Sequence, residues 1–231
     1  MKRIYYRESI SFNKEIELKQ EDSHHLSNVL RMKADDEIYI FNEKNGEWLC
    51  QIINFRKKNL ILLPTKLIRQ PEETIENISL AFSIIKNDSL HTMIRSATEI
   101  GVSHLYPIIS DRCVNRNLNL KKIEAYAKEA SQQCERLDIP KILPITTFNN
   151  FIEKKPYTGE LFVAIERGES KYKNFHSKNP CFLIGPEGGW SKKEIDVLNE
   201  REEIKKLSLG KNILRAETAA ISCMAISKLI K

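Results

Sequence analysis

Glycine-rich turns are the part of this chain best suited to hold a ligand. The apolar segment 181–184 stops at Gly-Pro-Glu-Gly-Gly (185–189), which contains three of the chain's eight glycines. Glycine allows positive φ and a close approach of the backbone to a ligand, and proline stiffens the bend. The stretch matches neither the standard dinucleotide fingerprint nor the triphosphate loop. By itself, it is equally typical of a plain turn between a strand and a helix.

A second turn of this kind lies in the sequence LSLGKNILRAET (207–218). It runs from an apolar segment through Gly210 into a short loop and then a helix. Ile213 and Leu214 are apolar where a solvated loop would be polar, and Arg215 and Glu217 flank the start of the last helix. Two such turns could form a cradle for a flat heterocycle. Backbone amides and carbonyls would recognise it, because the turns have few side chains that could.

A parallel sheet would bring the two turns together, and the chain from residue 78 onward predicts one. Apolar strands are predicted at 78–85, 104–110, 160–166, 181–185 and 204–210, and helices at 88–101, 120–137, 191–202 and 214–230. Continuous apolar strands that alternate with helices are typical of an α/β domain with a mostly parallel sheet. Such sheets bind ligands beyond the carboxyl ends of their strands, where both turns would lie.

Capping residues support two of these helices. Asp88 is the predicted N-cap of the helix at 88–101, and Gly101 ends it. Ser191 and Glu194 have the spacing of a capping box. The chain is therefore expected to pass directly from the first glycine turn into a helix.

The first seventy residues are predicted to form a separate β-rich domain. Strand segments 36–42 and 46–55 flank an Asn-Gly pair that favours a hairpin, and 59–68 is a further strand. A short helix is predicted at 21–32. A small barrel of this kind is a binding module rather than a catalytic one. The polar, proline-containing stretch 68–77 sets the predicted domains at 1–70 and 71–231.

Composition narrows the class of protein. The net charge of +6 is compatible with a nucleic-acid partner, because lysine and arginine neutralise phosphates, and equally with a mildly basic soluble protein. No run of about 18 apolar residues and no secretory leader is visible, which predicts a cytoplasmic protein without a membrane span. The five scattered cysteines contain no Cys-x-x-Cys pair, so we expect reduced thiols and no metal site.

The two turns taken together resemble those of the SPOUT methyltransferases. In particular, LIGPEGGWSKKEI followed by LSLGKNILRAETAA is similar to the bacterial family that methylates N3 of a uridine in small-subunit (16S) ribosomal RNA. Further similar stretches are HHLSNVLRM (24–32), IIKNDSLHTMIRSATEIGVSHLYPIISDR (84–112) and EASQQCERLDIP (129–140). The resemblance therefore covers nearly the whole chain in order, and the pair of turn motifs is its most specific part.

The resemblance implies a fold and a cofactor. The expected fold is a SPOUT-type α/β parallel sheet with a C-terminal trefoil knot, preceded by a PUA-like β-barrel that binds RNA. The enzyme would use S-adenosyl-L-methionine, form a homodimer and act on the small ribosomal subunit. The residues expected at the cofactor are Leu183, Ile184, Gly185, Gly188, Gly189, Leu209, Gly210, Asn212, Ile213 and Leu214. Leu183 and Ile184 can equally be core residues of a strand.

Methyl transfer to N3 of uracil suggests roles for several charged residues. The N3 proton must leave, or the negative charge that develops on the neighbouring carbonyl oxygens must be stabilised. Arg215 suits the second task, or a phosphate, because guanidinium is permanently charged and forked. A salt bridge between Arg215 and Glu217 is the alternative. Glu187 and Arg112 are further catalytic candidates, and Arg31, Lys86 and Arg136 are candidates for RNA contact or plain surface charges.

Two other functions remain open at this point. A SPOUT enzyme could instead methylate a ribose 2′-hydroxyl, with the same cradle for the cofactor. The chain could also be a non-catalytic RNA-binding protein that keeps the cradle, although its motif residues are intact.

Overall fold

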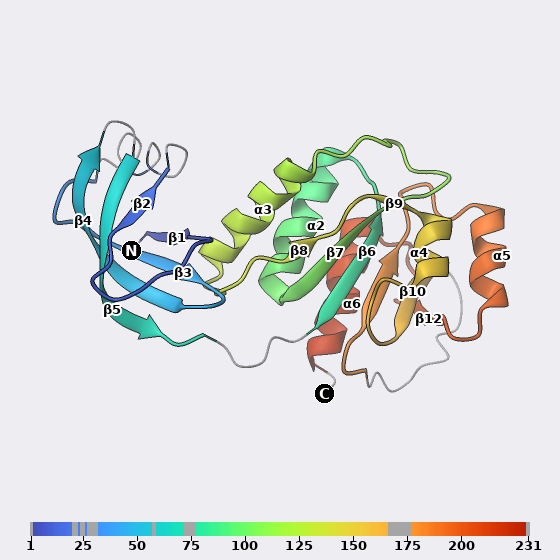
Figure 1. Cartoon of the computed structure of the whole chain (residues 1–231). Helices are drawn as coiled ribbons and strands as arrows, with labels where there is room; N and C mark the ends of the chain where they lie inside the picture. The colour runs from blue at the N-terminus through green and yellow to red at the C-terminus, as the bar shows by residue number, and fades with distance from the viewer. Residues whose placement is uncertain are drawn as a thin grey trace. The chain divides into compact units, whose positions relative to one another are not determined.

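A computed structural model of the chain describes residues 2–19, 23, 26, 32–56, 59–71, 77–165 and 177–229. These residues form two compact units, one made of Met1–Thr74 with Ser131–Asp138, the other of Ile75–Ala130 with Ile139–Lys231. Figure 1 shows the elements of both. The helix predicted at 21–32 lies almost wholly outside the described residues.

The first unit is a curled β-sheet around its own apolar core (Figure 1). Its strands are β1 (Arg3–Tyr5), β2 (Ile16–Leu18), β3 (Glu37–Asn42), β4 (Gly46–Arg56) and β5 (Asn59–Arg69), in the order β1-β3-β4-β5-β2. The predicted Asn-Gly hairpin joins β3 and β4. Gly46 has φ 77°, and a Cβ there would lie 2.1 Å from the carbonyl oxygen of Arg69, so only glycine fits this turn.

The second unit is built on a parallel sheet in the order β12-β10-β11-β6-β7-β8, with β9 paired to β7. Its strands are β6 (Ile78–Ser83), β7 (Val102–Ile109), β8 (Lys141–Ile142), β9 (Thr146–Thr147), β10 (Leu161–Ile165), β11 (Cys181–Ile184) and β12 (Lys205–Ser208). Its helices are α2 (Asn87–Ile100), α3 (Leu120–Gln133), α4 (Phe148–Lys154), α5 (Lys192–Glu200) and α6 (Ala216–Leu229), with the last residues of α3 counted in the first unit. The α/β parallel fold predicted from the sequence is confirmed.

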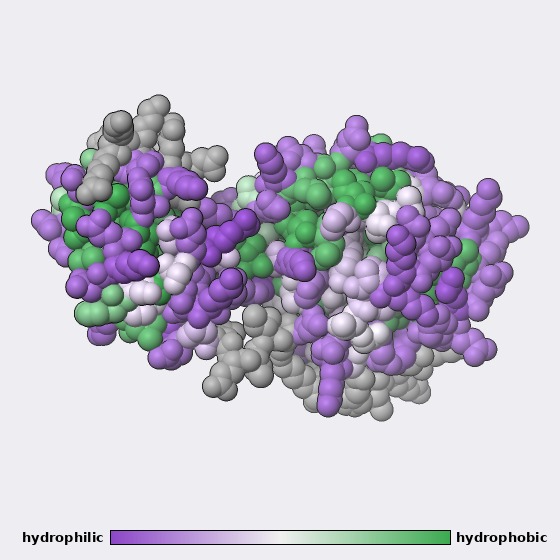
Figure 2. Space-filling view, in the orientation of Figure 1, coloured by the Kyte–Doolittle hydropathy of each residue, from purple (hydrophilic) through white to green (hydrophobic). Residues whose placement is uncertain are grey.

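Both faces of this sheet are covered, and the buried strand residues divide between the two cores. Phe182 and Ile184 face the core that contains α2, α3 and α6. Cys181 and Leu183 face the core that contains α4 and α5. This burial on both sides explains why the strands read as continuous apolar segments in the sequence. Hydrophilic residues cover most of the visible surface of each unit (Figure 2).

The ends of the helices confirm most of the predicted capping. Gly101 ends α2 in the left-handed conformation with φ 109°, and Ser191 and Glu194 form a complete capping box at α5. The prediction that Asp88 caps α2 is wrong, because the N-cap is Lys86 and Asp88 lies within the first turn. A carboxylate in the first turn still favours the helix dipole. The predicted helix 120–137 is also too long, since α3 ends at Gln133 and Glu135 has φ 63°.

Neither a metal site nor a membrane helix is found among the described residues. No described group of three or more His, Cys, Asp or Glu residues could hold a metal ion. No described helix is long and apolar enough to cross a membrane. The five cysteines are free, and burial raises the pKa of Cys50 and Cys223 to about 12. These two thiols therefore stay protonated near neutral pH and are poor nucleophiles.

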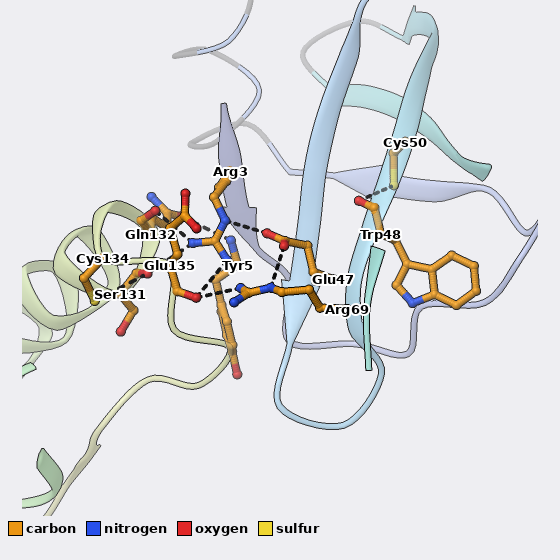
Figure 3. A network of polar contacts seen from close by, with 10 residues as sticks. All are labelled: Arg3, Tyr5, Glu47, Trp48, Cys50, Arg69, Ser131, Gln132, Cys134 and Glu135. Atoms are coloured by element: carbon orange, nitrogen blue, oxygen red, sulfur yellow. Dashed lines mark hydrogen bonds and ion pairs between the residues drawn. The ribbon is translucent and has the colours of Figure 1, made fainter. Parts of the chain in front are cut away.

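A charge network centred on the buried Glu47 links the sheet of the first unit to residues 131–138 (Figure 3). The Arg3 Nε donates to Glu47 Oε1 at 2.5 Å, and Arg69 Nε donates to Glu47 Oε2 at 2.8 Å. The same guanidinium groups donate onward to backbone carbonyls, Arg3 to Gln132 at 3.0 Å and Arg69 to Glu135 at 2.6 Å. The network thus binds residues 131–138 through one carbonyl in the last turn of α3 and one just beyond the helix, and neither has an intrahelical donor.

Removal of the central carboxylate should destabilise the first unit strongly. We expect Glu47→Ala to lower the free energy of unfolding by about 3–5 kcal/mol, because it leaves the largely buried Arg3 guanidinium uncompensated. Thermal or denaturant unfolding measures this. The control is Glu17→Ala in the same unit, which should matter little, because among the described residues its exposed carboxylate accepts only from Asn59. Equal losses in the two variants would contradict the assigned importance of the network.

Candidate functional site

The two glycine turns lie at the same edge of the parallel sheet. Strand β11 pairs with one side of β10 and β12 with the other, both in parallel. The carboxyl ends of β11 and β12 therefore point the same way and are separated by two inter-strand spacings, about 10 Å. The turns 185–191 and 209–215 follow directly from these ends.

The first turn is a tight bend built around a buried tryptophan. The backbone N–H of Gly189 donates to the carbonyl oxygen of Pro186 at 2.9 Å, and Gly189 has φ 67°. A Cβ on Gly185 would lie 3.0 Å from Cε2 of the buried Trp190. A side chain on Gly185 would therefore crowd the indole, and the positive φ of the bend favours glycine at position 189.

The second turn is more open. Gly210 has φ 113°, and a Cβ built on it would meet no atom within 4 Å. Asn212 and Ile213 are exposed, whereas Leu209 and Leu214 are half-buried against the core. An exposed apolar side chain beside a bare stretch of backbone is the environment that the sequence predicted for a flat ligand.

The start of α2 joins the two turns. The backbone N–H of Lys86 donates to Oε1 of Glu187 in the first turn, at 3.1 Å. The Ser89 hydroxyl donates to Oε1 of Glu217, which follows the second turn, also at 3.1 Å. Because Lys86 and Ser89 lie within one turn of helix, they tie both glycine turns to one rigid element.

The loop that follows β7 holds the first turn from another side. Arg112 Nη1 donates to the carbonyl oxygen of Gly188 at 3.0 Å, and the Ser191 hydroxyl donates to Oδ2 of Asp111 at 2.6 Å. The backbone N–H of Asp111 donates to the buried Glu194 at 2.9 Å. The sequence did not single out Asp111 or Ser89. Their only signal was a place just beyond a strand end, which many residues share.

Arg215 is exposed at the start of α6, and no described residue forms a hydrogen bond or ion pair with its side chain. The salt bridge to Glu217 that the sequence left open does not form, because Glu217 turns inward to Ser89 and is only 9% exposed. The guanidinium therefore remains available to a ligand at the edge that carries the two turns.

The other predicted site residues have mixed environments. Leu183 and Ile184 are buried, and their side chains fill the two cores. Lys86 is exposed at the carboxyl end of β6. Arg136 belongs to the first unit, where both oxygens of Asp138 accept from it at 2.8 and 2.6 Å. Arg31 lies outside the described residues.

Comparison with known families gives the class of protein. Residues 71–228 match the RNA methyltransferase domain family, and residues 18–64 match the RNA methyltransferase PUA domain. Together with the fold, this match identifies a methyltransferase of the SPOUT type with an N-terminal PUA domain. The chain belongs to the family of ribosomal RNA small subunit methyltransferase E proteins. The resemblance seen in the sequence is confirmed.

Individual relatives cover nearly the whole chain. The ribosomal RNA small subunit methyltransferase E of Rickettsia conorii is 33% identical over 99% of this chain and 95% of the relative. The corresponding protein of Bacillus subtilis is 27% identical over 89% of this chain and 86% of the relative. The crystal structure of the Neisseria gonorrhoeae protein bound to S-adenosyl methionine has a TM-score of 0.87 at 28% identity, covering 99% of this chain and 97% of that one.

Two glycines of the first turn form a matched pair for mutation. Gly185→Ala should destabilise the protein by about 1–3 kcal/mol, because the new methyl group displaces the Trp190 indole. Gly188→Ala should cost less, since its Cβ would meet Arg112 at an ordinary 3.5 Å. Thermal unfolding and tryptophan emission measure the difference. If Gly188→Ala proves the more damaging change, the packing account of Gly185 is wrong.

Proposed function

We propose that this chain is an S-adenosylmethionine-dependent enzyme that methylates N3 of a uridine in the 16S RNA of the small ribosomal subunit. The observation that carries the proposal is the joining of two strand-end glycine turns through the start of α2. Relatives along the full length of the chain are named as small-subunit ribosomal RNA methyltransferases, which supports the same reading. One related structure is bound to S-adenosyl methionine.

The residues of the two turns fit such a cofactor. The open space at Gly210 and the exposed side chain of Ile213 suit the adenosyl group, and Gly185, Gly188 and Gly189 let the backbone of the first turn approach it closely. Leu209, Asn212 and Leu214 complete the second turn. Leu183 and Ile184, at the carboxyl end of β11, lead into the first. When bound, the cofactor supplies a methyl group on a sulfonium. The turns then need only orient it towards the nucleophile.

The charged residues at this edge divide between catalysis and positioning. Arg215 stabilises the negative charge that develops on the uracil carbonyl oxygens as the N3 proton leaves. Glu187 is exposed and is the proposed proton acceptor, held in place by the Lys86 N–H. Arg112 is better described as a positioning residue than as the catalytic group expected from the sequence, since its Nη1 is hydrogen-bonded to the Gly188 carbonyl.

RNA binding and self-association complete the proposal. The net charge of +6 and the exposed Lys86 support contact with phosphates, whereas Arg136 is paired with Asp138 and Arg31 stays a candidate from the sequence alone. Apolar residues gather over α2 and α3 on the visible face of the second unit, and surfaces of this kind favour protein contacts (Figure 2). A cytoplasmic homodimer, as the resemblance implies, is therefore part of the proposal.

The modified nucleoside tests the reaction. Incubation of the protein with unmodified small ribosomal subunits and S-adenosylmethionine should yield one N3-methyluridine per 16S RNA, detected by mass spectrometry of nucleosides. Omission of the cofactor is the control. A ribose-methylated product would assign the chain to 2′-hydroxyl chemistry instead. Cofactor binding without any methylated product would favour the non-catalytic alternative.

Arg215 tests the proposed charge stabilisation. Arg215→Ala should lower kcat by about 10²- to 10³-fold, with little change in the affinity for the cofactor, because a preorganised donor to the developing charge is lost. Arg215→Lys should recover only part of the rate, since ammonium lacks the forked geometry. Lys211→Ala removes an exposed charge from the same turn and serves as the control. An equal loss in both alanine variants would indicate a general electrostatic effect.

A further inference from the structure

Glu217 is a buried carboxylate that is only half satisfied. It lies in the first turn of α6 and is 9% exposed. Oε1 accepts the hydroxyl hydrogen of Ser89 at 3.1 Å. Oε2 is buried, and no described residue donates a hydrogen bond to it. A buried polar atom without a partner requires an explanation, since most such atoms in proteins are satisfied.

A second carboxylate in the same unit shows what a purely structural role looks like. Glu194 occupies the first turn of α5 and is 4% exposed. Both of its oxygens accept backbone hydrogen bonds, Oε1 from Asp111 at 2.9 Å and Oε2 from Ser191 at 2.8 Å. Glu217 also lies in the first turn of its helix and is similarly buried, yet one of its oxygens is left open. Fastening α6 to α2 explains Oε1 but not Oε2.

The open oxygen lies where the two glycine turns are joined. Glu217 follows the turn 209–215 by two residues, and its partner Ser89 lies one helical turn after Lys86, which holds Glu187 of the other turn. The first backbone N–H groups of a helix have no intrahelical acceptor, and those around residue 216 lie next to this carboxylate in the sequence. Since Oε2 is shielded from solvent, its missing donor is expected to come from the chain itself.

We propose that Glu217 is a positioning residue for the cofactor, and that Oε2 accepts a backbone N–H of the turn 209–215 when S-adenosylmethionine orders this turn. The inference rests on the proposed function, because it requires that the turn bind that cofactor. Glu217 itself does not touch the cofactor. It fixes the ordered form of the turn against α2, so its loss weakens binding without altering the chemistry of methyl transfer.

Glu217→Met tests the proposal, because methionine has a similar size and cannot accept this hydrogen bond. The dissociation constant for S-adenosylmethionine, measured by calorimetry well below the unfolding temperature, should rise about tenfold, as a charged hydrogen bond is lost. The melting temperature without cofactor should fall only slightly, since the change removes the Ser89 hydrogen bond together with an unsatisfied buried oxygen. Glu217→Gln should restore most of the affinity, because a rotated amide donates to Ser89 and keeps an acceptor at the Oε2 position.

Hydrogen exchange supplies a readout that a purely structural role would not affect. The cofactor should slow exchange of the amides in 209–215 in the unsubstituted protein and in Glu217→Gln, but much less in Glu217→Met. Glu194→Gln is the control for a structural carboxylate, and it should lower the melting temperature.

The affinity of the folded variants decides the outcome. If Glu217→Met binds the cofactor within twofold of the unsubstituted protein, or if Glu217→Gln fails to restore binding, the positioning role is wrong while the proposed function stands. If the unsubstituted protein binds no S-adenosylmethionine even with the small ribosomal subunit present, the proposed function itself fails and the inference fails with it.

Discussion

The first turn of α2 is the constraint on which the rest of the site depends. A helix begins with backbone N–H groups that its own carbonyls cannot satisfy, and it carries a partial positive charge there. Carboxylates from two distant parts of the chain meet this end: Glu187 at the Lys86 N–H and Glu217 at the Ser89 hydroxyl. Each contact is modest in energy, but both fix flexible turns to the same rigid helix. The parallel sheet brings the turns to one edge, and these two hydrogen bonds set how they lie there.

The neighbouring contacts serve the same purpose by different chemistry. Trp190 packs under Gly185, so that the first turn rests on an apolar core residue. Glu194 belongs to the capping box of α5 and also accepts the backbone N–H of Asp111. Arg112 donates to the Gly188 carbonyl. The first turn is therefore held by several contacts, whereas in the second turn Gly210 is exposed and a Cβ built on it would meet no atom within 4 Å. This difference in support suggests that the first turn is preformed and that the second adapts to its ligand.

The sequence predicted those features that local patterns or specific motifs encode. The long strands and helices of the second unit, the Asn-Gly hairpin and the capping box each depend on residues close together in the chain. Strands of two or three residues, such as β1, β8 and β9, and the seven-residue helix α4 are too short for periodicity and were not predicted. Residues 131–138 belong to the first unit through contacts with Arg3 and Arg69, far away in the sequence. The roles of Ser89 and Arg112 are likewise set by partners more than 70 residues away, which no local pattern reveals.

The contrast between the arginines of the two units bears on the site itself. In the first unit, Arg3 and Arg69 donate hydrogen bonds to Glu47 and to backbone carbonyls, as expected of guanidinium groups that stabilise a fold. Arg215 is exposed at the N-terminus of α6, where the helix dipole disfavours positive charge, and the nearest acidic residue in its helix turns away from it. A residue that costs the fold stability and has no described partner is expected to act on something outside the fold. Under the proposed function, the partner at this edge is a negatively charged group of the substrate, either a phosphate or the uracil oxygens as they gain charge.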